Sequence, residues 1–155
     1  MTDMLVKLYT LPPLEPALEA TRQAGVEVRR AMAAERQKVV RWVETTFDTY
    51  WAGETAVAFA RQPVTCFIAI ADGQLVGFAC HDATCPNFFG PTGVDDRYRG
   101  RGIGKALLLA CLHDMAAQGY AYAIIGGVGP VEFYARTVGA VEIPDSTPGI
   151  YRQVV

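Results

Sequence analysis

A stretch rich in glycine and arginine near the middle of the chain has the residue types that bind a phosphate. It runs from Thr92 to Leu112 as TGVDDRYRGRGIGKALLLACL, with three glycines at alternating positions from Gly100 to Gly104. Glycine lets backbone N–H groups approach a ligand closely, and a helix N-terminus adds unpaired N–H groups and the positive end of the helix dipole. The stretch therefore predicts a cradle for a phosphate or pyrophosphate. The alternative is an ordinary glycine-rich turn that leads into a core helix.

Two familiar phosphate-binding loops do not fit this stretch. In a Walker loop, Gly104 and Lys105 would be followed by a hydroxyl residue, but Ala106 stands there, and Arg99 replaces the first glycine. In the dinucleotide-binding pattern, Leu107 occupies the place of the third glycine. Neither a nucleoside triphosphate nor a dinucleotide is therefore the predicted ligand.

The elements around the loop follow from hydrophobic periodicity. Ile103, Leu107, Ala110 and Cys111 have the spacing of one buried helix face, and Gly119 ends that helix. Residues 18–60 are predicted to form two or more helices, and a short helix is predicted over 130–137. Predicted strands cover 4–11, 64–70, 74–80, 87–94, 120–125, 139–144 and 149–155. Asp72 and Gly73 predict a hairpin between two of these strands, and Gly90 and Pro91 predict a bulge or a splayed end in a third.

Composition indicates one packed domain. The chain has 155 residues, of which 51% are hydrophobic and 19% are charged, and the element order predicts an α/β or α+β mixed sheet. We expect a single domain over residues 1–155. The net charge of −2 favours neither nucleic acid nor a membrane surface as a partner. No apolar stretch is long enough to span a bilayer and no signal peptide is evident, so a cytoplasmic protein with free thiols is expected.

The loop also matches a family motif. Arg99, Gly102 and Gly104 fill the pattern R/Q-x-x-G-x-G, with Val94 before it and a helix after it. This resembles the acyl-CoA pyrophosphate loop of the GNAT superfamily of N-acyltransferases, and the order of elements resembles the GNAT fold along essentially the whole chain. The resemblance implies a central mixed β-sheet flanked by helices, with acetyl-CoA as cosubstrate.

The resemblance also assigns the contacts to acetyl-CoA. Backbone groups of 99–105 would hold the pyrophosphate, and those of 92–94 would hold pantetheine and the acyl carbonyl. The predicted contact residues are Thr92, Gly93, Val94, Arg99, Gly100, Arg101, Gly102, Ile103, Gly104 and Lys105. The charged side chains of Arg97, Arg99, Arg101 and Lys105 either contact phosphates or remain in solvent.

Tyr134 is the predicted catalytic residue. It lies in VEFYARTVGA, which is similar to a Phe-Tyr segment of the family in which the tyrosine hydroxyl protonates the departing CoA thiolate. Without the resemblance, a tyrosine beside a phenylalanine on a short helix indicates core packing. Two nearby positions depart from the family pattern, because Gly127 and Pro130 replace an asparagine and an alanine.

The general base is not assigned by the resemblance. An acid that some family members carry aligns with Phe88, which cannot accept a proton. The candidates are His81, Asp82, Glu44, Asp48 and Glu54. A chain of water molecules, or an amine that arrives already neutral, would serve as well.

The cysteines suggest no further chemistry. Cys80, His81, Asp82 and Cys85 lack the second set of paired ligands that a structural zinc site needs, so no metal is predicted. A cysteine nucleophile is not favoured either, because His81 is the only nearby base.

The sequence as a whole predicts an N-acetyltransferase that transfers acetyl from acetyl-CoA directly to a primary amine, in a complex of all three. The acceptor is expected to be a small molecule, and the state of assembly, including a homodimer, is left open. Five aromatic residues could line the acceptor site or pack in the core: Trp42, Phe47, Trp51, Phe88 and Phe89. The alternative functions are a catalytically inactive CoA-binding module and a phosphate-binding structural protein.

Overall fold

The computed structural model describes all residues from 1 to 155. Its strands are β1 (Met4–Lys7), β2 (Val26–Arg30), β3 (Cys66–Ala71), β4 (Gln74–His81), β5 (Phe88–Val94), β6 (Tyr122–Ile125) and β7 (Val141–Glu142). Its helices are α1 (Leu14–Gln23), α2 (Arg36–Thr46), α3 (Thr49–Phe59), α4 (Ile103–Ala117) and α5 (Val131–Val138). The strands form one sheet in the order β2-β3-β4-β5-β6-β1-β7. All neighbours are antiparallel except β5 and β6, so the predicted mixed sheet flanked by helices is confirmed.

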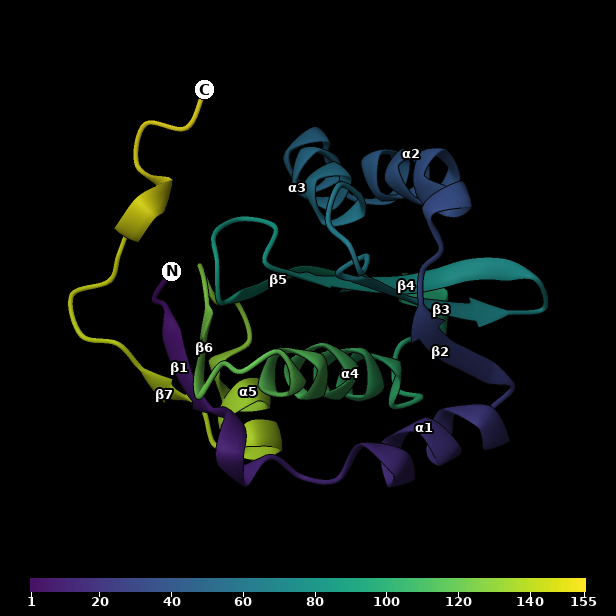
Figure 1. The fold of residues 1–155 in the computed structure, drawn as a ribbon, viewed down its shortest axis with the longest axis horizontal. Coiled ribbons are helices and arrows are strands. Elements are labelled where there is room, and N and C mark those ends of the chain that lie inside the picture. The colour runs from purple at the N-terminus through teal and green to yellow at the C-terminus, as the bar shows by residue number, and fades with distance from the viewer.

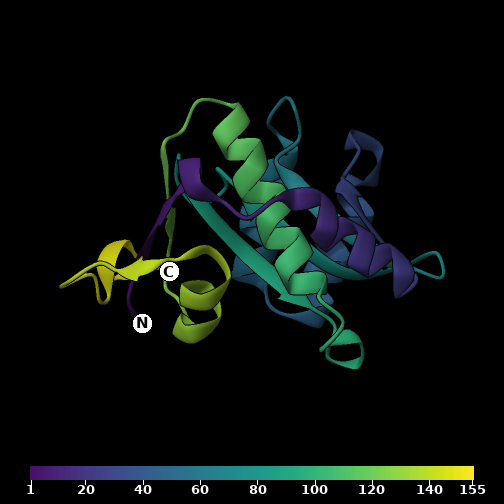
Figure 2. The same cartoon turned by 90° about the horizontal axis from the view of Figure 1, so that it is seen from below.

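The helices cover the two faces of this sheet. In Figure 1, α2 and α3 lie above the sheet, whereas α1, α4 and α5 lie below it. Seen from below, α4 crosses the sheet and α1 packs beside it (Figure 2). Each face has its own buried cluster of hydrophobic residues, the larger one around α4 and the smaller one under α2 and α3. None of the helices is long and apolar enough to cross a membrane.

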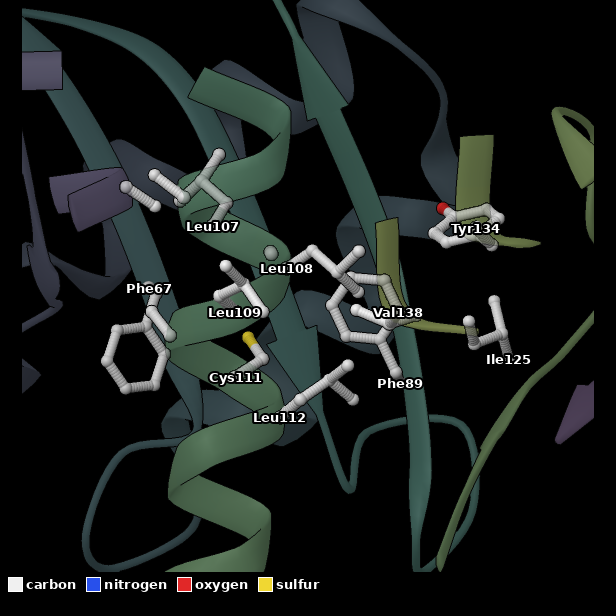
Figure 3. Close-up of a cluster of buried hydrophobic side chains, with 14 of the residues drawn as sticks. Phe67, Phe89, Leu107, Leu108, Leu109, Cys111, Leu112, Ile125, Tyr134 and Val138 are labelled. Carbon is white, nitrogen blue, oxygen red and sulfur yellow. The ribbon is translucent and has the colours of Figure 1, made fainter. Parts of the chain in front are cut away.

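The helix α4 is the centre of the larger cluster. Every residue from Ala106 to Leu112 is buried, which explains why the sequence there is apolar on all sides (Figure 3). Gly77 on β4 allows the close approach of this helix, because a Cβ at Gly77 would lie 3.1 Å from Leu107 and 3.3 Å from Ile103. This packing fixes the helix, and therefore the loop before it, on the sheet.

Two of the predicted turns are confirmed. Asp72 and Gly73 both have positive φ, 51° and 72°, as a two-residue hairpin turn between β3 and β4 requires. In β5, Gly90 has a φ of 123°, and the pairing with β4 shifts register between Ala79 and His81. The irregularity predicted at Gly90 is therefore present.

Three of the predicted elements were wrong. Residues 26–30 lie inside the predicted helical region but form β2, an edge strand in which only Val26 is buried. The first predicted strand ends at Lys7, and Leu8–Thr10 form a 3-10 helix. Residues 149–155 contain no strand, only the short 3-10 helix Gly149–Tyr151.

The strand β1 has an unusual position for its place in the sequence. It pairs with β6 on one side and with β7 on the other, so the first strand of the chain lies between two late ones. Met4 is opposite Ile125 and also opposite Glu142. This arrangement brings the first residues of the chain next to the loop that follows β6.

Candidate active site

A splay between β5 and β6 opens the middle of the sheet. The two strands pair only at Phe88 with Ile124 and at Phe89 with Ile125. The strand β6 ends there, and the chain leaves through residues 126–130 to α5, whereas β5 continues to Val94. Residues 90–94 therefore have no strand partner on the side of β6. Backbone groups on this open edge are available to a ligand that lies along β5.

The loop before α4 supplies a row of free backbone donors. The N–H groups of residues 100–105 donate no hydrogen bond within the protein, and the first intrahelical bond runs from Ala106 to the carbonyl of Gly102. The helix behind them is 15 residues long and adds the positive end of its dipole. Six consecutive free amides at such a helix end can bind a pyrophosphate.

The glycines of this loop leave open space beside its backbone. Gly100 and Gly102 have φ of 78° and 77°, which only glycine adopts easily. Gly104 is helical, and a Cβ there would meet only Val94, at 3.9 Å. Gly104 therefore lacks a side chain although neither its backbone nor its neighbours require this. The predicted close approach of a ligand would account for a glycine at this position.

The arginines around the loop are held at the surface. Arg97 pairs with Asp95 at 2.9 Å, and its side chain is 83% exposed. Arg99 pairs with Asp96 at 2.8 Å, and the guanidinium of Arg101 lies over the ring of Tyr98. The backbone amides, rather than these side chains, are therefore the groups left free at the predicted anion cradle.

Tyr134 lies at the edge of the larger cluster with its hydroxyl free. The residue is only 6% exposed, and its ring makes edge-to-face contacts with Phe89 and Phe133. Its hydroxyl has no hydrogen-bond partner in the protein, and in Figure 3 it is directed toward the side of β5. Burial raises the pKa of this hydroxyl to about 12. Tyr134 therefore stays protonated at neutral pH and can donate a proton into the splay.

The aromatic residues proposed as an acceptor wall have mostly structural positions. Trp42, Phe47 and Trp51 pack around Phe78 beneath α2 and α3. The ring of Phe47 occupies the space that a Cβ at Gly93 would need.

On β5 itself, Phe89 is 2% exposed and belongs to the core around α4. Phe88 is only partly buried, at the point where β5 and β6 separate. Of the five predicted aromatic residues, Phe88 is the one that lies at the closed end of the splay.

Two of the candidate bases belong to a buried network. The ring nitrogens of His81 lie 2.7 Å from carboxylate oxygens of Asp82 and Asp114, so both nitrogens have a partner. Asp114 is also held by Arg30 at 2.6 Å. Partial burial would raise the pKa of Asp114, but hydrogen bonds from His81 and Arg30 lower it to about 2. His81 is fully buried and engaged at both nitrogens, so the network is structural.

The other candidate bases differ in their surroundings. The carboxylate of Asp48 caps α3 by accepting from the amide of Trp51, and Glu44 is exposed on α2. Glu54 on α3 is half-buried and accepts a hydrogen bond of 2.8 Å from Thr84. Burial raises the pKa of Glu54 above its usual value, although the Thr84 hydroxyl opposes this in part.

Sequence reasoning missed a tyrosine that lies near Glu54. Tyr151 follows the last strand, and a Cβ at Gly126 would overlap its hydroxyl and touch the ring of Phe88. Burial, followed by the negative charges of Glu54 and Asp3, raises the pKa of Tyr151 to about 12. The residue stood inside a segment predicted to be a strand, and no local pattern marks it.

The cysteines and their neighbours do not assemble into a further site. Cys66, Cys80 and Cys111 are buried, and no three His, Cys, Asp or Glu side chains are arranged to hold a metal. A hydrogen bond with Cys80, together with burial, raises the pKa of Cys66 well above its usual value. Burial does the same to the pKa of Cys111, so neither thiol is activated as a nucleophile.

Comparison with known families identifies the chain's class. Residues 28–140 match the model of the acetyltransferase (GNAT) family, and the chain belongs to this family. The match spans the region from β2 to the end of α5 and leaves β1, α1 and the segment after Ala140 outside. No curated protein sequence matches the chain.

Solved structures show the same fold at low sequence identity. A glucosamine N-acetyltransferase region of a fungal multi-domain β-N-acetylglucosaminidase is 13% identical, with a TM-score of 0.73 over 92% of this chain and 19% of the fungal one. A GCN5-related N-acetyltransferase from Sphaerobacter thermophilus is 20% identical, with a TM-score of 0.64 over 92% of this chain and 48% of that one. A GNAT acetyltransferase from Brucella melitensis in complex with acetyl-CoA is 18% identical, with a TM-score of 0.57 over 72% of this chain and 80% of that one. The chain thus spans less than half of the first two proteins.

The family match confirms the class predicted from the loop motif. The predicted GNAT-like fold, the acetyltransferase class and acetyl-CoA as the cosubstrate of that class are confirmed. The individual contact residues and the role of Tyr134 remain predictions.

Proposed function

We propose that this chain transfers acetyl from acetyl-CoA directly to a primary amine of a small molecule. The observation that supports the proposal is the combination of six free amides before α4, an open edge of β5 and the unpaired hydroxyl of Tyr134. An acyl-CoA needs a pyrophosphate site, an extended groove and a proton donor near its sulfur, in this order. The name of the fungal glucosamine N-acetyltransferase region supports a small-molecule amine as acceptor.

The binding step follows from the backbone. Amides of residues 99–105 would bind the pyrophosphate, and the open edge of residues 92–94 would pair with the amides of pantetheine. The side chains of Arg99, Arg101 and Lys105 lie at the rim of this site and would add long-range attraction for the phosphates. A backbone N–H of β5 near the acyl carbonyl would stabilise the oxyanion that forms when the amine attacks.

The chemical step needs a proton for the departing sulfur. The amine nitrogen attacks the thioester carbon, the C–S bond breaks, and Tyr134 donates its proton to the thiolate. The proton that the acylated nitrogen loses then passes through solvent to the Tyr134 phenolate. The high pKa of Tyr134 keeps this proton in place until the thiolate develops. Gly127 and Pro130 leave the pantetheine arm without the side-chain contacts that the family pattern offers there, so backbone contacts would carry more of its binding.

The second candidate function is a CoA-binding module without catalysis. The observation that favours it is Phe88, which stands where some family members carry an acid. An amine-panel screen separates the two functions: thiol release from acetyl-CoA is recorded with each amine, and the product is identified by mass. Acetylation of any amine above the uncatalysed rate establishes the enzyme. CoA binding by calorimetry, without acetylation of any amine, would instead establish the binding module.

A further inference from the structure

The closed end of the splay carries a group of polar residues that the proposed mechanism does not yet use. Glu54 reaches it from α3, Thr84 from the loop between β4 and β5, and Tyr151 from the segment after β7. Thr84 hydrogen-bonds to Glu54 at 2.8 Å, and Tyr151 is held against Gly126 and the ring of Phe88. Three separate segments therefore converge where an acceptor amine would meet the thioester.

Glu54 has no positive partner in this region. None of the protein's ion pairs involves Glu54 or Asp3. Asp3 is only 8% exposed, and its carboxylate accepts a hydrogen bond of 2.8 Å from the amide of Gly127. Both carboxylates act on Tyr151 and raise its pKa. The groups that act on Tyr151 therefore include two carboxylates and no cation, which favours a positively charged ligand beside them.

We propose that Glu54 is the general base of this acetyl transfer, and that Glu54, Thr84, Tyr151 and Asp3 form the pocket for a cationic amine. The inference rests on the proposed acetyl-transfer function. It supplies, from a different element, the base that is missing at Phe88: Phe88 and Tyr151 lie against the same glycine, and the charge of Glu54 acts on Tyr151. Tyr151 limits the size of the pocket and offers a hydroxyl to the amine.

The proton transfers balance in this scheme. The bound ammonium gives one proton to the Glu54 carboxylate and becomes the neutral nucleophile. The nitrogen then bonds to the acetyl carbon, the C–S bond breaks, and Tyr134 protonates the sulfur. The remaining excess proton on the nitrogen passes through solvent to the Tyr134 phenolate, and Glu54 releases its proton to water. One ammonium and one acetyl-CoA thus yield one amide, one CoA thiol and one proton.

The surroundings of Glu54 suit this role. Burial raises its pKa, and the negative charge of Asp48 on the same helix adds to this, so the carboxylate accepts a proton more readily than an exposed one. The other titratable groups that face the pocket are Tyr151, Asp3 and Cys85, and all three reach it from other elements. No basic side chain opposes them.

The charge of the pocket is tested with two amines of matched length. Putrescine and γ-aminobutyrate both present a primary amine on a short alkyl chain, but one ends in an ammonium and the other in a carboxylate. We expect kcat/KM for putrescine to exceed that for γ-aminobutyrate by at least about tenfold, or about 1.4 kcal/mol. A preference for γ-aminobutyrate, or equal rates, would overturn the cationic pocket while the proposed acetyl transfer stands.

The role of Glu54 is tested with Glu54→Gln, and Glu27→Gln, at an exposed position of β2, is the control. Glu54→Gln should lower kcat/KM for the better amine by about 10²-fold or more and remove the acidic limb of the pH profile. CoA affinity measured by calorimetry should be unchanged, and Glu27→Gln should keep the parental rate. An unchanged pH profile in Glu54→Gln would overturn the base assignment.

A second variant tests the same assignment even if Glu54→Gln does not fold. Thr84→Val retains the carboxylate but removes the hydrogen bond that lowers the pKa of Glu54, so the acidic limb should move to higher pH. An acidic limb that stays in place in Thr84→Val contradicts the assignment. If the parental protein binds CoA but acetylates no amine, the proposed function fails and the inference fails with it.

Discussion

At the scale of single residues, Gly102 and Gly104 serve the same loop through different properties of glycine. Gly102 has a positive φ, so any side chain there strains the backbone before a ligand is considered. Gly104 is helical and has open space beside it, so its missing side chain matters only to what binds. Gly104 is therefore the cleaner position at which to test the anion cradle.

Replacing Gly104 by alanine should weaken CoA binding without harming the fold. Alanine stabilises a helix by up to about 1 kcal/mol relative to glycine, whereas its methyl group would project into the space proposed for the pyrophosphate. Calorimetric titration with CoA should show a loss of about tenfold or more, and urea unfolding should show equal or higher stability. Gly53→Ala in α3 is the matched control, because that glycine is likewise helical and has nothing within 4 Å of its Cβ position. Equal CoA affinity in both variants would show that the loop does not bind CoA.

Replacing Tyr134 by phenylalanine should slow the chemical step alone. The hydroxyl has no partner in the protein, so its removal leaves the packing against Phe89 and Phe133 intact. The CoA thiol is a fairly good leaving group, and we therefore expect a loss of up to about 10²-fold in the single-turnover rate, with CoA affinity retained. A parental single-turnover rate would show that Tyr134 only packs.

At the scale of elements, the contact between Phe47 and Gly93 sets the distance between the α2–α3 layer and β5. Phe47 follows α2 directly, and its ring lies where a side chain at Gly93 would be. The same stretch of β5 is proposed to hold pantetheine on its free edge. The aromatic packing and the cosubstrate groove therefore depend on one strand.

Replacing Gly93 by alanine should destabilise this contact. The added methyl group would overlap the Phe47 ring, and overpacking of this kind lowers the free energy of unfolding by about 1–3 kcal/mol. Adding Phe47→Leu to Gly93→Ala should recover part of this loss, because the smaller side chain makes room. Urea unfolding of the single and double variants measures the coupling, and strictly additive effects would show that the two residues do not compete for space.

At the scale of the whole molecule, the network of His81 and Asp114 joins distant parts of the chain. Arg30 comes from β2, His81 from β4 and Asp114 from the last turns of α4. Asp82 extends the network by accepting from Tyr120 at 2.8 Å and from the amide of Asn87 at 2.7 Å. These bonds tie the C-terminal half of α4 to the sheet, at the end opposite the anion cradle.

Strong acid should weaken this network. The pKa of Asp114 is about 2 in the folded protein, against an ordinary value of 3.8. A depressed pKa contributes stability that is complete above the ordinary value and is lost as pH falls toward the folded-state value, here about 2 kcal/mol between about pH 4 and pH 2. Asp114→Asn should be less stable than the parent by about 3 kcal/mol at neutral pH, and this difference should shrink across the same interval. Urea unfolding at a series of pH values measures this difference in the free energy of unfolding. A difference that stays constant with pH would exclude the titration of Asp114 as its source.

The sequence predicted those elements that are marked by the types and spacing of a few neighbouring residues. The apolar helix α4, the hairpin at Asp72 and Gly73, and the irregular strand β5 all have such signals. The strand β2 was missed because Glu27, Arg29 and Arg30 make an edge strand look like an exposed helix face. The pocket around Glu54 depends on contacts with Tyr151 and Asp3, which are formed by residues far apart in sequence, and no local pattern reports such contacts.

The position of β1 has a consequence for the order in which the protein is made and folded. Met4 leaves the ribosome early, but its partner Ile125 follows more than a hundred residues later, a wait on the order of ten seconds at ordinary rates of synthesis. During this interval β2, β3, β4, β5 and α4 can assemble, whereas β1 remains an apolar strand without neighbours. Asp3 reaches Gly127 only when this last pairing forms. We therefore expect the nascent chain to form the proposed anion cradle before the proposed acceptor site, so that cosubstrate binding precedes catalytic competence during synthesis.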